Sequence, residues 1–131
     1  MAEEALVESS VTDSVKLVNE LDKQGDTPSN VLWYFFSDAE VWRLLVAGGA
    51  FDSLLPRDES RAYQKIARAI GSANRTSLSI ADVKLVRTDD PVLIATKFVI
   101  KTPADDVVRA HFRDNTFNGI FVKAMLVLRA A

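Results

Sequence analysis

Residues 31–36 read Val-Leu-Trp-Tyr-Phe-Phe, and the conformation of this run decides the fold. Aromatic and β-branched side chains favour a strand, and six residues is a common strand length. In a strand, Trp33 and Phe35 point to one face. Tyr34 and Phe36 point to the other, so both faces need cover. We therefore expect a central core strand, although a short apolar run can also be a buried helix, which would remove one strand from the sheet.

The residues that follow this run predict a helix. Ser37 and Glu40 have the spacing of a capping box, in which each side chain bonds to the backbone N–H of the other residue. The glycines at 48–49 would end the helix. We expect it to span 38–47.

Two longer helices are expected on either side of this region. Apolar residues three or four apart predict an amphipathic helix over 3–24 that ends at Gly25, and a frayed start is the alternative. Pro56 suits a first helical position and predicts a helix that ends at Gly71. The inner face of this second helix contains Ala62, Tyr63, Ile66, Ala69 and Ile70.

The second half of the chain changes to the period of strands. Alternating apolar residues predict strands over 78–85, with a break near its centre, and over 92–101, joined by a turn at 88–91. A threonine–proline pair predicts the start of a helix over 103–113. A last strand is expected over 120–129, with its alternate apolar residues on one face.

This order of elements predicts an α+β fold. Helices lie mainly in the N-terminal half and pack on a small, mostly antiparallel sheet of three to four strands. The chain from 92 to 129 fits a right-handed parallel crossover or an antiparallel return. We expect a single domain over 1–131, whose acidic amphipathic helix within 1–26 belongs to the core or is frayed or appended.

Composition excludes several kinds of site. The chain has no cysteine and one histidine, His111, so thiolate zinc sites, iron–sulfur clusters, cysteine nucleophiles, disulfides and paired-histidine metal sites are ruled out. No catalytic motif surrounds the other residues, and we expect no metal, no cofactor and no catalytic residue. His111 is predicted to pack on the inner side of the helix over 103–113.

The ends and the apolar stretches predict a cytoplasmic protein without membrane contact. The acidic start lacks the positive region and apolar run of a secretory signal. The stretches 31–36 and 119–128 are much shorter than the ~20 residues that span a bilayer. A sequence without cysteine fits a reducing compartment.

The charge is unevenly distributed along the chain. Residues 1–26 contain seven acidic and two basic residues, whereas 57–75 contain five basic and two acidic ones. The five basic residues form what we call the basic ridge: Arg57, Arg61, Lys65, Arg68 and Arg75. The first four share one helical face, where like charges repel one another. An acidic helix of the same chain, another protein or a phosphate backbone could neutralise them, and a solvated face is the simpler interpretation.

Aromatic residues form the second candidate site. The candidate interface or pocket residues are Trp33, Tyr34, Phe35, Phe36 and Trp42. Tryptophan and tyrosine are favoured anchors of interfaces, but a central core strand explains the same cluster.

These features predict a small, non-enzymatic protein–protein interaction module, with self-association of acidic helix against basic ridge as one form of it. The alternative is binding of nucleic acid or another polyanion through the basic helix over 56–70. A second alternative is a small enzyme with an aromatic-lined pocket near His111.

Overall fold

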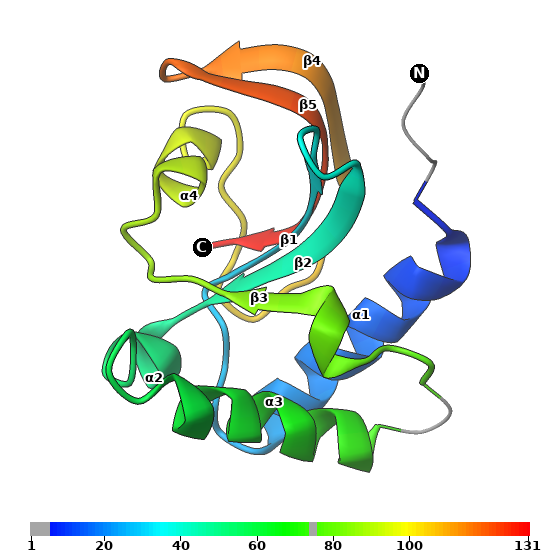
Figure 1. Cartoon of the computed structure of the whole chain (residues 1–131), viewed down its shortest axis with the longest axis vertical. Helices are drawn as coiled ribbons and strands as arrows, with labels where there is room; N and C mark the ends of the chain where they lie inside the picture. The colour runs from blue at the N-terminus through cyan, green and yellow to red at the C-terminus, as the bar shows by residue number, and fades with distance from the viewer. Residues whose placement is uncertain (1–5, 74–75) are drawn as a thin grey trace.

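The computed structural model describes residues 6–73 and 76–131. Five strands form its sheet: β1 Asn30–Phe36, β2 Val41–Ala47, β3 Val83–Leu85, β4 Ala110–Phe117 and β5 Ile120–Ala130. Their order across the sheet is β3-β2-β1-β5-β4 (Figure 1). The strands pair antiparallel, except that β2 and β3 run parallel.

Strand β1 is the centre of the sheet, as the apolar run predicts. Its side chains alternate between two buried sides of the sheet. Val31 and Trp33 lie in one hydrophobic cluster, whereas Leu32 and Tyr34 lie in the other. The prediction of a central core strand is confirmed, and the helical alternative for this run is wrong.

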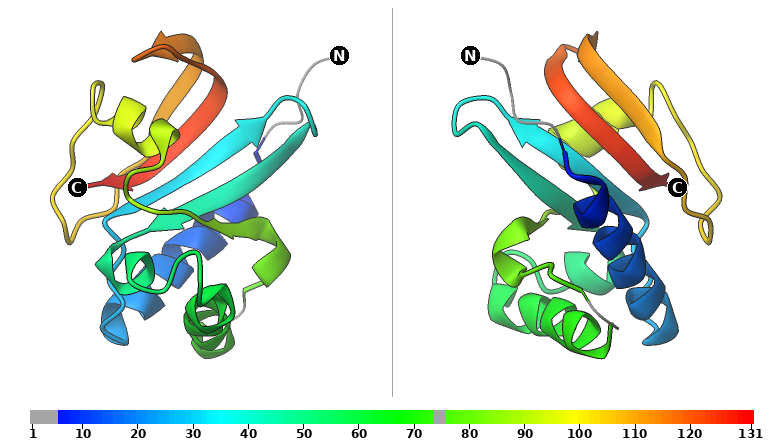
Figure 2. Two further views of the ribbon diagram at one scale, coloured as in Figure 1. Left: turned by 60° about the vertical axis from the view of Figure 1, so that its left-hand side comes forward. Right: turned by 90° about the vertical axis from the view of Figure 1, so that its right-hand side faces the viewer.

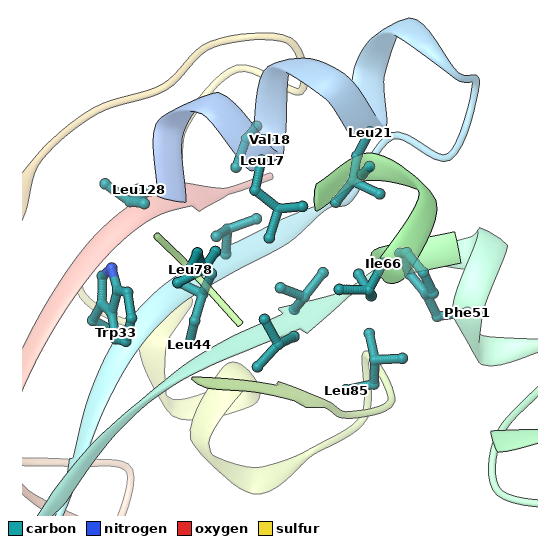
Figure 3. Packing of buried hydrophobic residues seen from close by; sticks show 14 of the residues in the cluster. Leu17, Val18, Leu21, Trp33, Leu44, Phe51, Ile66, Leu78, Leu85 and Leu128 are labelled. Atoms are coloured by element: carbon teal, nitrogen blue, oxygen red, sulfur yellow. The ribbon is translucent and has the colours of Figure 1, made fainter. Parts of the chain in front are cut away.

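Four α-helices and one short 3-10 helix accompany the strands within the described residues: α1 Glu8–Lys23, α2 Gly49–Asp52, α3 Glu59–Ser72, η1 Ile80–Asp82 and α4 Pro91–Thr96. Helices α1 and α3 pack on one face of the sheet and enclose the larger cluster, which includes Leu17, Ile66 and Leu128 (Figure 3). Leu93 of α4 packs into the smaller cluster on the other face. The β4–β5 hairpin curves away from α1 and α3 (Figure 2).

The α+β class is confirmed, but the predicted sheet is too small. It has five strands rather than three to four, and it is mixed because β3 runs parallel to β2. The extra strands come from two segments that the sequence predicts to be helical.

The helix predicted over 38–47 is wrong, because most of this segment is strand β2. Residues 37–40 form the tight turn between β1 and β2, and Glu40 takes a left-handed conformation with φ of 55°. Seven residues of β2 pair with β1. A helix cap contributes only about 1 kcal/mol. Pairing with β1 buries Leu44 and Leu45 on opposite faces of the sheet, and this burial outweighs the cap.

The strand predicted over 92–101 is also wrong, because the segment contains helix α4. The Asp90 side chain accepts a 2.9 Å hydrogen bond from the Val92 N–H, which caps the helix, and a proline occupies the first helical position. The helical period buries Leu93, which is out of phase with the predicted strand, and Phe98, in the turn after the helix, is 68% exposed.

The helix predicted over 103–113 is wrong as well. Residues 101–109 have no regular structure and run beside the end of β5, where the Thr102 N–H donates to the Ala130 carbonyl and the Val108 N–H to the Leu128 carbonyl, both at 2.8 Å. Strand β4 then pairs antiparallel with β5 as a hairpin. The parallel crossover and the antiparallel return both require a strand over 92–101. Because this segment is not a strand, both predictions are wrong.

Other boundaries are close to their predictions. Helix α1 begins at Glu8, after non-helical residues 6–7, and the rest of its predicted start lies outside the described residues. Gly25, with φ of 84°, follows its end as predicted. Helix α3 begins three residues after Pro56 and buries the predicted inner face. In 78–85, only β3 is a strand, and η1 forms the predicted break.

The last strand is confirmed as β5, but its alternate residues do not share one face. Leu126 and Leu128 lie in the larger cluster, whereas Val122 lies in the smaller one. Val31 pairs with Arg129 and Leu32 with Val127, so Leu128 is an additional residue in β5. Val122 and Leu126 both precede this bulge, so it does not account for their different clusters. It changes the alternation of the residues after it, and Ala130 therefore lies in the smaller cluster.

The bulge turns Arg129 toward α1. Its guanidinium group is fully buried and makes a two-pronged ion pair with Asp22, with both N–O distances 3.1 Å. It also donates to the carbonyl oxygens of Pro28, at 3.1 Å, and Asp106, at 2.8 Å. One side chain therefore joins β5, α1, the segment before β1 and the irregular segment before β4.

We expect Arg129→Met to lower the free energy of unfolding by about 3 kcal/mol, because it leaves a carboxylate and two carbonyls without their donor. Urea unfolding followed by circular dichroism measures this change. Arg109→Met is the matched control: Arg109 pairs with Glu8 on the surface, and we expect a loss below about 1 kcal/mol. Equal losses in the two variants would contradict the role of Arg129.

Candidate functional site

The four described members of the basic ridge lie in two places. Arg61, Lys65 and Arg68 lie on α3, and Arg57 lies exposed in the turn that precedes the helix. Arg75, the fifth predicted member, lies outside the described residues.

Part of the ridge is neutralised within the chain. The Lys65 ammonium group lies 2.8 Å from Asp26 Oδ1, just beyond the end of α1. Gln24 holds this pair together, because its side-chain amide donates to Asp26 at 2.9 Å and to the Lys65 carbonyl at 3.0 Å. Arg61 pairs with Asp58 at 3.3 Å. The acidic segment of the same chain thus supplies one of the expected partners.

These contacts determine the ionisation of Asp26. Burial acts to raise the pKa of its carboxyl, but hydrogen bonds from Lys65 and Gln24, with the charges of Lys65 and Arg68, outweigh burial and lower the pKa below 3.8. The Asp26 carboxylate is therefore ionised at neutral pH and holds Lys65 in place.

A depression lies between α2 and α3. Its volume is about 420 Å³, and it is lined by Ala50, Ser53, Leu54, Arg61, Gln64, Lys65 and Arg68. The three cations of α3 are thus brought together at one concave surface, whereas Arg57 is not part of it.

The aromatic candidates are mostly core residues. Trp33, Tyr34 and Phe35 are at most 9% exposed. The Trp33 indole N–H donates to the Ser14 hydroxyl at 3.0 Å, which satisfies its polar group inside the core. Burial, together with the charge of Asp90, raises the pKa of Tyr34.

Phe36 and Trp42 are half-buried at the end of the β1–β2 hairpin. The Phe36 ring lies 5.0 Å from that of Tyr34, and the Trp42 ring lies 5.4 Å from that of Phe35. Trp42 also lines a depression of about 280 Å³, together with Leu6, Val7, Ser10, Trp33, Glu40, Val41 and Asp82. Of the predicted aromatic residues, Trp33 and Trp42 thus lie together in the lining of one depression.

His111 lies in a different place from its prediction. It is exposed on β4, not packed on a helix, and it does not line the depression that contains Trp33 and Trp42. Among residues 6–73 and 76–131, no group of three or more His, Asp or Glu side chains is placed to hold a metal ion.

The sequence pattern does not predict the exposure of the apolar residues after Asp90. We define the α4 apolar surface as Ile94, Phe98 and Val99, which are 40%, 68% and 38% exposed. The strand prediction places Ile94 and Phe98 on a buried face. Asp90 at the cap and the proline at the first helical position are the signal that could have predicted α4.

Both edges of the sheet are obstructed. The Val86 N–H bonds to β2, so the Leu85 N–H points to the open side of β3, where it donates to the Tyr63 hydroxyl at 3.0 Å. Arg43 donates to the Val83 carbonyl at 3.1 Å. On the other edge, Asp114 of β4 interrupts the extended backbone with φ of 51°. Neither edge offers a long, regular strand to another chain.

No protein-family model, curated protein or solved structure matches this chain. In the part of the chain that the structure describes, no helix has the length and apolar character needed to cross a membrane.

The Asp26–Lys65 pair gives a pH-dependent prediction. Because the folded-state pKa of Asp26 is lowered, its carboxylate stabilises the fold above about pH 3.8, and the contribution is lost as pH falls through the folded-state pKa. We expect Asp26→Asn to lower the free energy of unfolding by about 1–2 kcal/mol at neutral pH, with a smaller difference in acid.

Urea unfolding of the parent and of Asp26→Asn, from neutral pH to below about pH 3.8, measures this difference in the free energy of unfolding. Asp89→Asn is the control, since the Asp89–Arg87 pair is exposed and a small effect at every pH is expected. A difference between Asp26→Asn and the parent that stays constant from neutral to acidic pH would contradict the assignment.

Proposed function

We propose that this chain is a non-enzymatic protein-binding module whose contact surface is the α4 apolar surface. The observation that carries the proposal is the 68% exposure of Phe98, which is followed in sequence by exposed Val99 and preceded four residues earlier by exposed Ile94. Burying the rest of such a ring against a partner gains about 2 kcal/mol of transfer free energy. Aromatic side chains that are exposed in the free protein are frequent anchors of interfaces.

The backbone beneath this surface is held in place. Leu93 is fully buried in the smaller cluster. The Thr96 hydroxyl donates to the Val92 carbonyl at 2.8 Å and lies 3.8 Å from the Met125 sulfur on β5. A backbone that is already fixed loses little conformational entropy on binding, so only the ordering of the side chains opposes the contact.

The polar surroundings fit the rim of an interface. Lys97 and Lys101 are exposed on either side of Phe98 and Val99. Interfaces combine an apolar centre with a polar rim in this way. Because both sheet edges are obstructed, side-chain contact at α4 is favoured over the addition of a strand.

A second copy of the chain is the first partner to test. An apolar surface can be self-complementary about a two-fold axis. The net charge of −2 causes little repulsion between copies. A cytoplasmic location is part of this proposal and is supported by the cysteine-free composition.

Polyanion binding through α3 is the second candidate. The depression lined by Arg61, Lys65 and Arg68 favours it, and the pairing of two of these cations with Asp58 and Asp26 weakens it. An enzymatic role near His111 has less support, since this residue is exposed on β4 and apart from the aromatic depression.

Sedimentation equilibrium from low to high micromolar concentration tests self-association. We expect the parent protein to associate and Phe98→Glu to remain monomeric, because a charge cannot be buried in an apolar contact. Its free energy of unfolding should change by less than about 0.5 kcal/mol, as for other exposed positions.

Phe121→Glu is the matched control, because Phe121 on β5 is 56% exposed and lies outside the α4 apolar surface. This variant should associate like the parent. A parent protein that stays monomeric would reject self-association, and equal disruption by both variants would reject the surface.

A different protein partner is tested by photo-crosslinking in the source cells. A photoreactive phenylalanine analogue at position 98 should give a discrete crosslinked product that the same analogue at position 121 does not give. If the parent protein is monomeric, identical crosslinking patterns at positions 98 and 121 would contradict the proposal. The absence of a crosslinked product at position 98 would contradict it as well.

A further inference from the structure

We propose that the depression between α2 and α3 binds the polyphosphate group of a small ligand. This inference deepens the second candidate function and rests on it, and it is independent of the α4 apolar surface. The two surfaces lie on opposite faces of the sheet, because α3 packs into the larger cluster and α4 into the smaller one.

The lining of the depression consists of hydrogen-bond donors and small apolar groups. Besides its three cations, it contains the Ser53 hydroxyl and the Gln64 amide, and no acidic side chain lines it. The neighbouring depression at the β3 edge contains Glu59, and the one near Trp42 contains Glu40 and Asp82. Of these surfaces, the one between α2 and α3 is therefore the best suited to an anion.

The cations keep donors for a ligand. Lys65 has three N–H donors, of which Asp26 takes one, and Arg61 has five, of which Asp58 takes one. Arg68 makes no hydrogen bond or ion pair with another described residue, although its charge acts on Asp26. Asp26 thus positions Lys65 without using up its capacity to bind, and the five charged groups together remain at +1.

The spacing of the cations indicates the length of the ligand. From Arg61 to Arg68 the helix rises by about 10 Å, at 1.5 Å per residue. A short chain of linked phosphates can contact both ends of this row with the arginine side chains directed outward, whereas a single phosphate requires both side chains to bend toward the middle of the row. Guanidinium groups bind phosphate oxygens in pairs, which suits the two arginines at the ends.

The lining also indicates which part of a ligand is recognised. No aromatic side chain lines this depression, so a nucleobase would have no ring to stack on. Arg57, which would extend the cationic row along a nucleic-acid backbone, is outside it. A compact polyphosphate therefore fits better than an extended strand.

Inorganic tripolyphosphate is the probe that tests this inference. Titration of the full chain, followed by calorimetry and by backbone amide NMR, should give saturable binding in low salt. The largest shifts are expected at Ser53, Gln64, Lys65 and Arg68. We expect Arg68→Glu to weaken binding at least about tenfold.

Arg57→Glu is the matched control, because it makes the same charge change at an exposed position outside the depression. It should weaken binding by no more than about twofold, through long-range attraction alone. Thermal unfolding by circular dichroism verifies that both variants fold. Equal weakening by the two variants, or no saturable shift at millimolar tripolyphosphate, would overturn the inference.

Titration with a single-stranded oligonucleotide distinguishes the polyphosphate site from general polyanion binding along α3. Oligonucleotide binding that both variants weaken, without tripolyphosphate binding, would overturn the polyphosphate site and leave polyanion binding along α3 in place. Absence of binding to either probe in low salt would reject both.

Discussion

The buried guanidinium group of Arg129 is the interaction on which the rest of the structure depends. A charge without solvent contact is tolerated only when its donors are satisfied, and here a carboxylate and two carbonyls satisfy them. The bulge at Leu128 is needed for this, because regular alternation would turn Arg129 to the opposite face of the sheet. The ion pair with Asp22 fixes α1 against β5, so the end of the chain is joined to its first helix.

This arrangement determines which surfaces are free. Helices α1 and α3 cover one face of the sheet side by side. Asp26, which follows the end of α1, therefore lies close to α3 and pairs with Lys65 within the chain. Of the helices in the described residues, α4 alone contributes to the cluster on the other face. Six helical residues cover little area, and the apolar side chains beyond them remain exposed. The α4 apolar surface thus follows from the unequal cover of the two faces.

The sequence predicts those elements whose local signals agree with their environment. The alternating run of β1, the period of α1 and α3, and β5 are of this kind. The capping-box pattern at Ser37 is present in sequence but loses to pairing with β1, which no local pattern reports. The hairpin of β4 and β5 has a local signal in Asn118-Gly119, whose φ values of 47° and 80° suit a tight hairpin turn. The basic ridge could be identified, but its partner Asp26 could not, since the pair joins residues 39 positions apart.

We propose that the chain binds a protein through the residues of α4 and the turn that follows. Hydrogen–deuterium exchange, compared between dilute and concentrated protein, locates the contact without any substitution. We expect slower exchange at high concentration within 91–100, with unchanged exchange in β4 and α3. Protection along β4 instead, or protection of the whole chain to the same extent, would contradict it.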